Sequence, residues 1–417
     1  MTGTPRPAAR LTNRDDLTTY HPHPYRLYRY GANTANMEVT SVEATPVEID
    51  IRPLSEEYGV APYIAGYTTF EEILRLVIRV ETDEGVVGWG ETMVDPEPSV
   101  AMATVENVIA PRVVGHSVWE IETVLDSFDY PYMDITPYVG GVEMALWDAL
   151  GKSVGEPIHK FLGGKRTDEV PVAYCLGILD PAESAERARW ARDQGFEVIK
   201  TKGGLDIDQD VERLVAMHEA VDGDLRFRLD GNQTMSFEEA TTTAARLEDA
   251  GVYLQYFEQP LRIDNVGGYT RLRQRLQTAI GVNEDAYHAR NLFELVREDA
   301  IDAAVVDLIP TGGLLATKKA MGLVDDANVS VAHHSSFDLG IKTAAVLQLV
   351  AASPAMNLPP DRVNYALADD VIEDRFAVTD GRMSVPDGPG LGVTVDEAKL
   401  DEHRVESGEG ISYDVSL

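Results

Sequence analysis

The chain of 417 residues carries 36 Lys and Arg against 70 Asp and Glu, which gives a net charge of −34 at pH 7. Its hydrophobic content of 44% suffices for a large core, and its single cysteine, Cys175, excludes intrachain disulfides. The acidic balance argues against nucleic acid as a partner, because phosphate contacts need clustered cations. No apolar run reaches the roughly 20 residues that span a bilayer, and no signal-peptide pattern is present, so we expect a cytoplasmic protein without a membrane partner.

The excess acidic residues are spread along the chain rather than gathered in a tail. A diffuse excess is typical of proteins that stay soluble in concentrated salt, where screening weakens their self-repulsion. We therefore expect a halophilic protein.

The first 36 residues differ in composition from the rest of the chain. Residues 1–36 hold five arginines and two aspartates, with prolines and tyrosines scattered among them. This pattern predicts a poorly ordered basic arm, or sequence upstream of a true start at Met37.

Residues 37–167 are predicted to form an α+β capping domain that shapes the substrate site. Its first strands alternate in polarity and are rich in β-branched residues, as in a meander. These strands are Val39–Ile51, Ile73–Glu81 and Val86–Glu91, and helical periodicity follows in Ser99–Ile109, Glu120–Phe128 and Gly141–Gly151.

A long irregular stretch, from Arg52 to Thr69, lies between the first two of these strands. A loop of that length inside a compact domain is usually a lid or a binding loop. We therefore expect Tyr58 and Tyr63 to contact the substrate, with packing as the alternative role for these side chains.

From residue 168 to residue 368, short apolar strands alternate with amphipathic helices. This alternation predicts an α/β fold in which eight parallel strands close into a TIM barrel. An open doubly wound sheet is the alternative, but no G-x-G-x-x-G motif follows a first strand. Residues 369–417 are expected to return to the capping domain. The predicted strands are Val170–Leu176, Phe196–Lys202, Arg226–Asn232, Tyr253–Gln259, Ile280–Glu284, Ala303–Ile309, Val329–His333 and Val363–Leu367.

Two lysines stand at the end of the second predicted barrel strand. Lys200 and Lys202 are two residues apart, so both side chains point to the same face of the strand. A partly desolvated lysine beside a second cation has its pKa lowered toward the range of a useful base. The alternative is a solvated strand end.

Acidic residues end the next three strands, at Asp230, Glu258 and Glu284. Such carboxylates converge at the mouth of a barrel and repel one another unless a cation neutralises them. Hard oxygen ligands suit Mg²⁺, and no cysteine cluster or His-x-x-x-His pair favours zinc. The sequence therefore predicts a magnesium site.

The sixth strand ends at Asp307, and the seventh ends at the pair His333-His334. An aspartate that contacts a histidine on the neighbouring strand orients the imidazole for acid–base chemistry. We expect this second acid–base group to face the lysines across the metal.

These residues, taken in order, resemble the enolase superfamily and, within it, the mandelate racemase-like subgroup. The resemblance extends from Met37 to the C-terminus. The matching motifs are Lys200-Thr201-Lys202, Asp230-x-Asn232, Glu258-Gln259-Pro260, Asn283-Glu284, Asp307 followed by Gly312-Gly313, and His334.

The resemblance implies a role for each residue, with Mn²⁺ as an alternative to Mg²⁺. The implied metal ligands are Asp230, Glu258 and Glu284, the implied acid–base residues are Lys202 and the Asp307–His334 pair, and the implied substrate contacts are Lys200, Asn232 and His333. Asn283 is an alternative metal ligand, but the count from the strand start favours Glu284. Spacing likewise favours His334 over His333 as the acid–base histidine. The resemblance also implies a homo-oligomer built from dimers, up to an octamer.

The implied reaction removes the proton next to a substrate carboxylate. Muconate cycloisomerases and dipeptide epimerases resemble each other in having a lysine at the position of Asp307. The aspartate in this chain disfavours those activities. Mandelate racemase has a glutamate near the end of strand eight, whereas the predicted strand here has no acid before Asp369. We therefore expect an acid-sugar dehydratase that yields a 2-keto-3-deoxy acid, with a 2-hydroxy acid racemase as the alternative. A cycloisomerase and a metal-binding barrel without activity are further alternatives.

Overall fold

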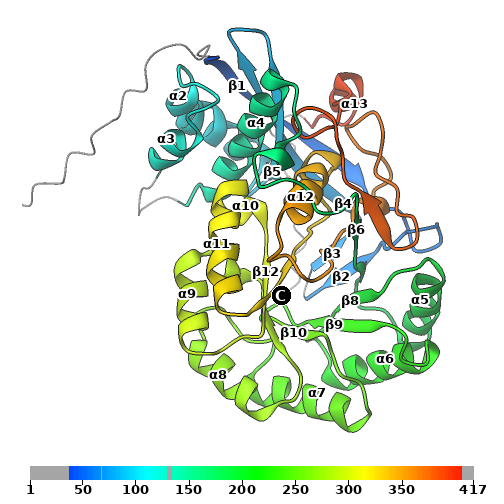
Figure 1. The fold of residues 1–417 in the computed structure, drawn as a ribbon. Coiled ribbons are helices and arrows are strands. Elements are labelled where there is room, and N and C mark those ends of the chain that lie inside the picture. Colours follow the sequence, from blue (N-terminus) through cyan, green and yellow to red (C-terminus); the bar gives the residue numbers. More distant parts are fainter. Residues whose placement is uncertain (1–36, 67, 129–133, 406–417) are drawn as a thin grey trace, which may run out of the picture. The chain divides into compact units, whose positions relative to one another are not determined.

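The computed structural model describes residues 37–66, 68–128 and 134–405 (Figure 1). The predicted basic arm, residues 1–36, lies outside these described residues, as does the end of the predicted C-terminal segment from residue 406. Among the residues described, no helix combines the length and the apolar character needed to cross a membrane.

The first part of the described chain is an antiparallel sheet with helices packed on it. The sheet order is β1-β4-β5, with bounds Val39–Asp50, Glu72–Thr82 and Val87–Met93. The predicted meander is therefore confirmed. The helices that follow are α1 (Pro98–Thr104), the π-helix η1 (Val105–Ile109), α2 (Ala110–Val113), α3 (Ile121–Asp126) and α4 (Thr136–Val154).

Two glycines let the buried helix α4 lie directly against strand β5. A Cβ atom added at Gly90 would stand 2.0 Å from the carbonyl oxygen of Gly141, and one at Gly88 would stand 2.1 Å from that of Ala145. Because any side chain there would collide with backbone, these glycines set the close helix-to-sheet contact.

A seven-stranded parallel sheet follows, in the order β13-β12-β11-β10-β9-β8-β7. Figure 1 shows helices α5 to α9 and α11 on the outer side of these strands. The strands are β7 (Tyr174–Leu176), β8 (Val198–Lys202), β9 (Arg226–Asp230), β10 (Tyr256–Glu258), β11 (Ile280–Val282), β12 (Ala303–Val306) and β13 (Ser330–His333). Each of the second to seventh predicted barrel strands contains an observed strand, although the sixth ends at Val306 because a short helix begins at Leu308.

Side chains at the starts of the outer helices satisfy free backbone N–H groups. Asp180, Asp206 and Asn265 each accept a hydrogen bond within the first turn, and Ser236 and Glu239 form a reciprocal capping box. These helices are α5 (Pro181–Asp193), α6 (Ile207–Ala220), α7 (Phe237–Asp249), α8 (Val266–Arg275), α9 (Ala289–Arg297), α10 (Leu308–Thr311), α11 (Leu314–Asp326) and α12 (Gly340–Ala352). Short 3-10 turns are η2 (Ile158–Lys160), η3 (Glu284–Tyr287) and η4 (Asn364–Ala366).

The prediction for the eighth strand, Val363–Leu367, is wrong, because that stretch contains the 3-10 turn η4. The gap between β13 and β7 is instead closed by residues 358–361. Leu358 and Asp361 donate backbone hydrogen bonds to Val331 and His333, and Ala173 donates to Pro360. Two prolines in this segment, Pro359 and Pro360, lack the N–H groups of a regular strand, so an isolated bridge replaces the ladder. The fold is a modified TIM barrel.

The predicted first strand, Val170–Leu176, is split in two. Its first half is β6 (Glu169–Pro171), which pairs antiparallel with β14 (Arg382–Ser384), and its second half is the barrel strand β7. The described C-terminal residues, which include α13 (Glu397–Glu402), contact β1 through backbone hydrogen bonds from Glu48 to His403 and from Val405 to Pro46.

Buried carboxylates from the first part of the chain cap two barrel helices. Glu143 on α4 accepts hydrogen bonds at 2.9 Å from the backbone N–H groups of Leu314 and Leu315, at the start of α11. The N-cap residue of α11 is Gly313, where a Cβ would stand 2.4 Å from the Glu143 carboxylate. Glu91 on β5 caps α12 in the same way, through Leu339 and Lys342.

Glu143 is expected to make stability depend on pH. Burial raises the pKa of Glu143 to about 7, although three hydrogen bonds oppose this shift. A carboxyl whose folded pKa exceeds its unfolded value contributes stability below the unfolded pKa and loses that contribution as pH rises through the folded pKa. Between pH 5.5 and pH 8.5 the lost contribution is about 2 kcal/mol, at about 1.4 kcal/mol per pKa unit.

Urea unfolding of the wild type and of Glu143→Gln at these two pH values measures this contribution. The variant is expected to lose less stability than the wild type as pH rises. The exposed Glu212 on α6 gives the control variant Glu212→Gln, which should follow the wild type. Equal pH dependence in all three proteins would contradict the assignment.

Candidate active site

The ends of three neighbouring strands place the predicted lysines and carboxylates side by side. In the parallel register Lys202 on β8 is level with Asp230 on β9, which is level with Glu258 on β10. The Nζ atom of Lys202 lies 2.6 Å from Oδ2 of Asp230. The structure therefore brings together the residues that the strand pattern predicted at the end of the barrel.

Lys200 lies deeper than Lys202 and is enclosed by carboxylates. Its Nζ atom is 2.6 Å from Glu258, 3.0 Å from Asp361 and 3.2 Å from Asp230. An ammonium group has three donors, and hydrogen bonds to Glu258 and Asp361 use two of them, while the Asp230 carboxylate lies within ion-pair distance. Lys200 is buried and paired within the protein, and its contact with a substrate carboxylate stays a prediction.

The surroundings of Lys200 also reverse the direction of the pKa shift expected from two adjacent cations, which was downward. Burial disfavours the charged ammonium, but Asp361, Glu258 and Asp230 outweigh it and hold the pKa of Lys200 well above its usual range. Lys200 is therefore a fixed positive charge beneath the site rather than a base. Lys202 has one carboxylate partner, Asp230, and so keeps donor positions free.

Sequence reasoning missed Asp361, which lies in the segment that closes the barrel. Its carboxylate contacts Lys200 at 3.0 Å and Arg228 at 2.8 Å, and the Arg228 guanidinium lies 4.8 Å from the ring of Tyr256. The expected absence of an acid from the eighth strand is thus corrected, because Asp361 is that acid. It lies inside the barrel, paired with two cations.

Removal of Asp361 is expected to destabilise the protein strongly. Breaking a buried ion pair by deleting one partner typically costs about 3–5 kcal/mol, since the remaining charge stays buried. Asp361→Ala should lower the free energy of unfolding by that order, as measured by urea titration at pH 7. Asp208, an exposed partner of Arg246, gives the control Asp208→Ala, which should change stability far less. Equal losses in both variants would contradict this account of Asp361.

Several buried oxygen atoms at the strand ends have no hydrogen-bond partner among the described residues. They include Oε2 of Glu258, Oε2 of Glu284 and Oδ1 of Asn232. Burial and the nearby charge of Asp230 raise the pKa of Glu258, whereas Lys202 and Lys200 overcome burial and lower that of Asp230. Unpartnered carboxylate oxygens of this kind are suited to a hard cation.

Glu284 and Asn283 differ in how far the protein already uses their side chains. The Asn283 amide donates to the Val305 carbonyl at 2.8 Å and accepts from the Tyr287 hydroxyl at 2.9 Å. Glu284 accepts one hydrogen bond, from Gln233 at 3.0 Å, through Oε1 alone. Glu284 therefore retains an oxygen for a ligand, whereas the Asn283 amide is occupied at both ends. Within the described ranges, no three His, Cys, Asp or Glu side chains are already arranged to hold one metal ion.

The second acid–base group lies at the ends of β12 and β13. Nδ1 of His334 is 3.1 Å from Oδ2 of Asp307, and the His334 side chain is 13% exposed. Strands β8 and β12 are four steps apart in the sheet order, so they lie on opposite sides of a closed barrel of eight staves. Lys202 and the His334–Asp307 pair thus approach the mouth from opposite sides.

The His333 side chain is fully buried, and its contact with the substrate stays a prediction. Its Nε2 accepts a hydrogen bond from the Leu308 backbone at 3.1 Å, and its Nδ1 lies 2.5 Å from the His334 carbonyl. Burial lowers the pKa of His333 to about 3, so the ring is neutral and holds the backbone at the strand end.

The two predicted lid tyrosines have different surroundings. Tyr63 lies on β2 (Tyr63–Ala65), which pairs with β3 (Thr68–Phe70), and its ring packs edge-on against Phe337 at 4.9 Å. Burial first, and then the charges of Cys175 and Asp230, shift the pKa of Tyr63 upward, while Lys200 opposes this shift, so the phenol is near the strand ends. Tyr58 instead packs on Trp190 at 4.9 Å and points its hydroxyl at the Val378 carbonyl. These contacts of Tyr58 agree with packing, the alternative role, and its contact with the substrate stays a prediction.

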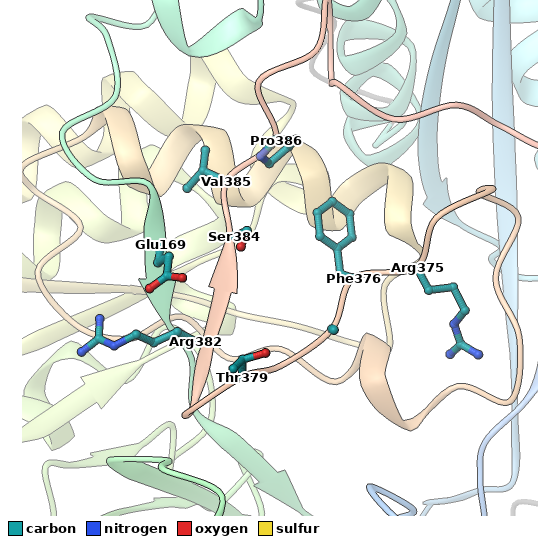
Figure 2. Close-up of a pocket in the computed structure, with 9 residues that line it drawn as sticks. Glu169, Arg375, Phe376, Thr379, Arg382, Ser384, Val385 and Pro386 are labelled. Atoms are coloured by element: carbon teal, nitrogen blue, oxygen red, sulfur yellow. The ribbon is translucent and has the colours of Figure 1, made fainter.

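A separate cavity of about 350 Å³ lies beside the β6–β14 pair. Figure 2 shows Glu169 on β6 next to β14, which carries Arg382 and Ser384, while Phe376 and Arg375 lie on the segment before β14. None of the predicted site residues lines this cavity, so it is distinct from the strand-end cluster.

A barrel with a lysine and a His–Asp pair on opposite sides of buried carboxylates is an arrangement suited to enzymes that ionise carbon acids. Family comparison agrees. An enolase C-terminal domain-like family matches residues 183–399, and the N-terminal domain of mandelate racemase / muconate lactonizing enzyme matches residues 48–163. The chain belongs to the mandelate racemase-like subgroup of the enolase superfamily and is an enzyme of that superfamily.

Individual relatives cover most of the chain at low identity. The arabinonate dehydratase of Saccharolobus solfataricus is 28% identical over 79% of this chain and 90% of its own length. The N-succinyl-L-Arg/Lys racemase of Bacillus cereus is 22% identical over 88% of this chain and 98% of its own length. A solved Streptomyces coelicolor structure described as an enolase and putative sugar isomerase is 30% identical, with a TM-score of 0.78, and covers 88% of this chain and 96% of that one. Dehydratases, racemases and cycloisomerases all occur among the relatives.

Proposed function

We propose that this enzyme is a Mg²⁺-dependent acid-sugar dehydratase. The observation that carries the proposal is the placement of Lys202 and the His334–Asp307 pair on opposite sides of the barrel mouth. One group can remove the proton α to a carboxylate while the other handles a second proton. An arabinonate dehydratase at 28% identity and a probable glucarate dehydratase at 27% identity support this choice.

Asp230, Glu258 and Glu284 are the residues that would hold the metal. Unpartnered buried oxygens on Glu258 and Glu284 fit this role, and members of the superfamily generally use Mg²⁺. When bound, Mg²⁺ would supply positive charge that stabilises the substrate carboxylate as its negative charge grows. Mn²⁺ is the alternative ion.

The protein's own groups account for the proton transfers. Lys202, as the neutral amine, takes the α-proton, and Lys200 stays protonated beneath the site to balance the carboxylates. His334, as the imidazolium held by Asp307, donates a proton to the β-hydroxyl, which leaves as water. Loss of the α-proton and the β-hydroxyl gives an enol, which becomes the 2-keto-3-deoxy acid.

A 2-hydroxy acid racemase is the second candidate, and one observation favours it. A lysine and a histidine on opposite sides of the barrel mouth can remove a proton from one face of the substrate and return it to the other. Among the relatives, a racemase aligns with 88% of this chain. The buried position of Asp361, paired with Lys200 and Arg228, leaves it unavailable for the role of the strand-eight glutamate of mandelate racemase.

A substrate panel distinguishes these candidates. The protein is incubated with MgCl₂ and aldonic or aldaric acids, and 2-keto-3-deoxy products are detected with semicarbazide. Racemisation of 2-hydroxy acids is followed by optical rotation, and α-proton loss is followed by deuterium incorporation from ²H₂O. Formation of a 2-keto-3-deoxy acid is the expected result. Loss of optical rotation without any dehydration would establish the racemase instead, and no deuterium incorporation with any carboxylate would overturn both.

A further inference from the structure

A buried lysine, Lys342, contacts the acid–base pair from helix α12. It is the one charged residue of this helix, whose sequence is GIKTAAVLQLVAA, and it is only 3% exposed. Lysine is rarely buried to this extent unless it is paired. The chemistry proposed above does not use Lys342, so its position needs its own explanation.

Lys342 holds the same carboxylate that orients the histidine. Its Nζ atom lies 2.9 Å from Oδ1 and 3.0 Å from Oδ2 of Asp307, while His334 contacts Oδ2 at 3.1 Å. Oδ1 also accepts the Ile309 backbone N–H at 3.0 Å. Asp307 therefore has a permanent cation as a partner in addition to His334. In a simple His–Asp pair, by contrast, the imidazole alone would balance the carboxylate.

Other charged groups complete a balanced cluster around this contact. Asp338 pairs with Lys342 at 2.7 Å and with Arg362 at 3.1 Å, and Arg362 also donates to the His334 carbonyl at 2.6 Å. With His334 neutral, two carboxylates (Asp307 and Asp338) face two cations (Lys342 and Arg362), so the sum is zero.

The remaining titratable groups near the cluster belong to the elements packed against it. His333 is neutral, and Asp361 is paired with Lys200 and Arg228. The Tyr287 phenol is close enough to Asp307 that the charge of Asp307 raises its pKa. Glu91 caps the start of α12 and lies 3.9 Å from Arg75. Asp361 and Glu91 also interact with members of the cluster, since the charge of His334 lowers the pKa of Asp361 and the charge of Asp338 raises that of Glu91. Both residues stay unchanged in the variants that test the cluster.

We propose that Lys342 is a positioning residue that fixes Asp307 and balances its charge, so that His334 need not act as the counter-ion of Asp307. This inference rests on the proposed function of the His334–Asp307 pair. An imidazole relieved of that task gives up an acquired proton more readily, which suits donation to a leaving hydroxyl. Asp338, the i,i+4 partner, partly neutralises the charge of Lys342 and so determines how strongly Lys342 stabilises the ionised Asp307.

The electrostatics of Asp307 agree with this geometry. Burial opposes ionisation of Asp307, but Lys342 is the largest charge that favours it, ahead of both histidines, and the pKa of Asp307 falls well below its usual range. Burial likewise opposes the charge of Lys342, but Asp307 and Asp338 raise its pKa. The two groups therefore stay charged together.

Two substitutions with opposite expected effects test the proposal. Lys342→Met removes a positive charge from the balanced cluster, so the titration midpoint of the His334 imidazole should rise by roughly 1 pH unit or more. Asp338→Asn removes a negative charge, so that midpoint should fall. Midpoints are read by NMR of ¹⁵N-histidine-labelled protein, with the His334 signal assigned by its loss in His334→Gln. Residues that only support the fold would not produce shifts of opposite sign.

The pH dependence of catalysis gives a second measurement. In the wild type, α-deuterium exchange at the face served by His334 should have a limb that follows the NMR midpoint, and this limb should move with it in both variants. The control is Lys152→Met, which also removes a lysine from an i,i+4 pair with a buried aspartate, Asp148, at a distant site. This control should leave both the midpoint and the limb unchanged.

The outcomes separate this inference from the proposed function. Unchanged midpoints in Lys342→Met and Asp338→Asn would overturn the role of Lys342, whatever the enzyme's substrate is. If Lys342→Met does not fold, the absence of a downward shift in Asp338→Asn would overturn it. Opposite midpoint shifts in a protein that exchanges no α-proton would support the inference and contradict the proposed function.

Discussion

Replacement of Lys202 by alanine is expected to lower both turnover and α-proton exchange by about 10²–10⁴-fold, the usual contribution of a general base. Lys202 is the lysine of the pair with free donor positions, because Asp230 is its one carboxylate partner. Lys200 cannot replace it, since three carboxylates hold Lys200 in the protonated form. The loss should therefore appear in kcat more than in KM.

The measurement is deuterium incorporation at the α-carbon in ²H₂O, with the dehydration rate followed in parallel. Lys318 gives a control, Lys318→Ala, because it is an exposed lysine on α11 that donates to the Leu162 carbonyl far from the strand ends. Full activity in Lys202→Ala, with Lys318→Ala also active, would show that another group takes the proton. The circular dichroism spectrum of each variant separates loss of a base from loss of the fold.

The strands that carry this chemistry were predictable because each combines a short apolar run with a charged end. Phe196–Lys202 and Arg226–Asn232 contain β8 and β9, and Lys202 and Asp230 face each other in the observed register. The parallel arrangement then follows from the intervening helices. Local pattern thus suffices to place Lys202 and Asp230.

The segment that closes the barrel, residues 358–361, could not be predicted because its contacts are not encoded in a local pattern. Pro359 and Pro360 remove the alternation that marks a strand, and the segment is held by Val331, His333 and Ala173, which are distant in the chain. Asp361 was missed for this reason. Lys342 gave no signal either, because an isolated lysine in an apolar helix does not reveal a partner such as Asp307, 35 residues earlier.

The surroundings of Lys200 show a further limit of sequence reasoning. Two lysines on one strand face suggest mutual repulsion and a lowered pKa, whereas the structure adds Glu258 and Asp361 around Lys200. The sign of a pKa shift depends on all the charges within a few ångströms, and these come from strands that are far apart in sequence.

Removal of the metal is expected to abolish activity and to lower stability. Treatment with EDTA should reduce α-proton exchange by at least about 10³-fold, since a metal that stabilises growing negative charge contributes several kcal/mol to the transition state. Restoring Mg²⁺ should restore exchange. Unchanged activity in EDTA would contradict the assignment of the carboxylates to metal binding.

Stability provides a measurement that does not depend on knowing the substrate. The unpartnered oxygens of Glu258 and Glu284 are costly to bury, so a bound cation should favour the folded state. Free Mg²⁺ at 100 times its Kd should add about 2.7 kcal/mol to the free energy of unfolding. Glu284→Gln should lose most of this gain, whereas Glu294→Gln, on the surface helix α9, should retain it. If Mg²⁺ stabilised both variants equally, Glu284 would not be a ligand. Asn283 is a poor substitute, because its backbone N–H and its side chain are already hydrogen-bonded to Gln259, Val305 and Tyr287.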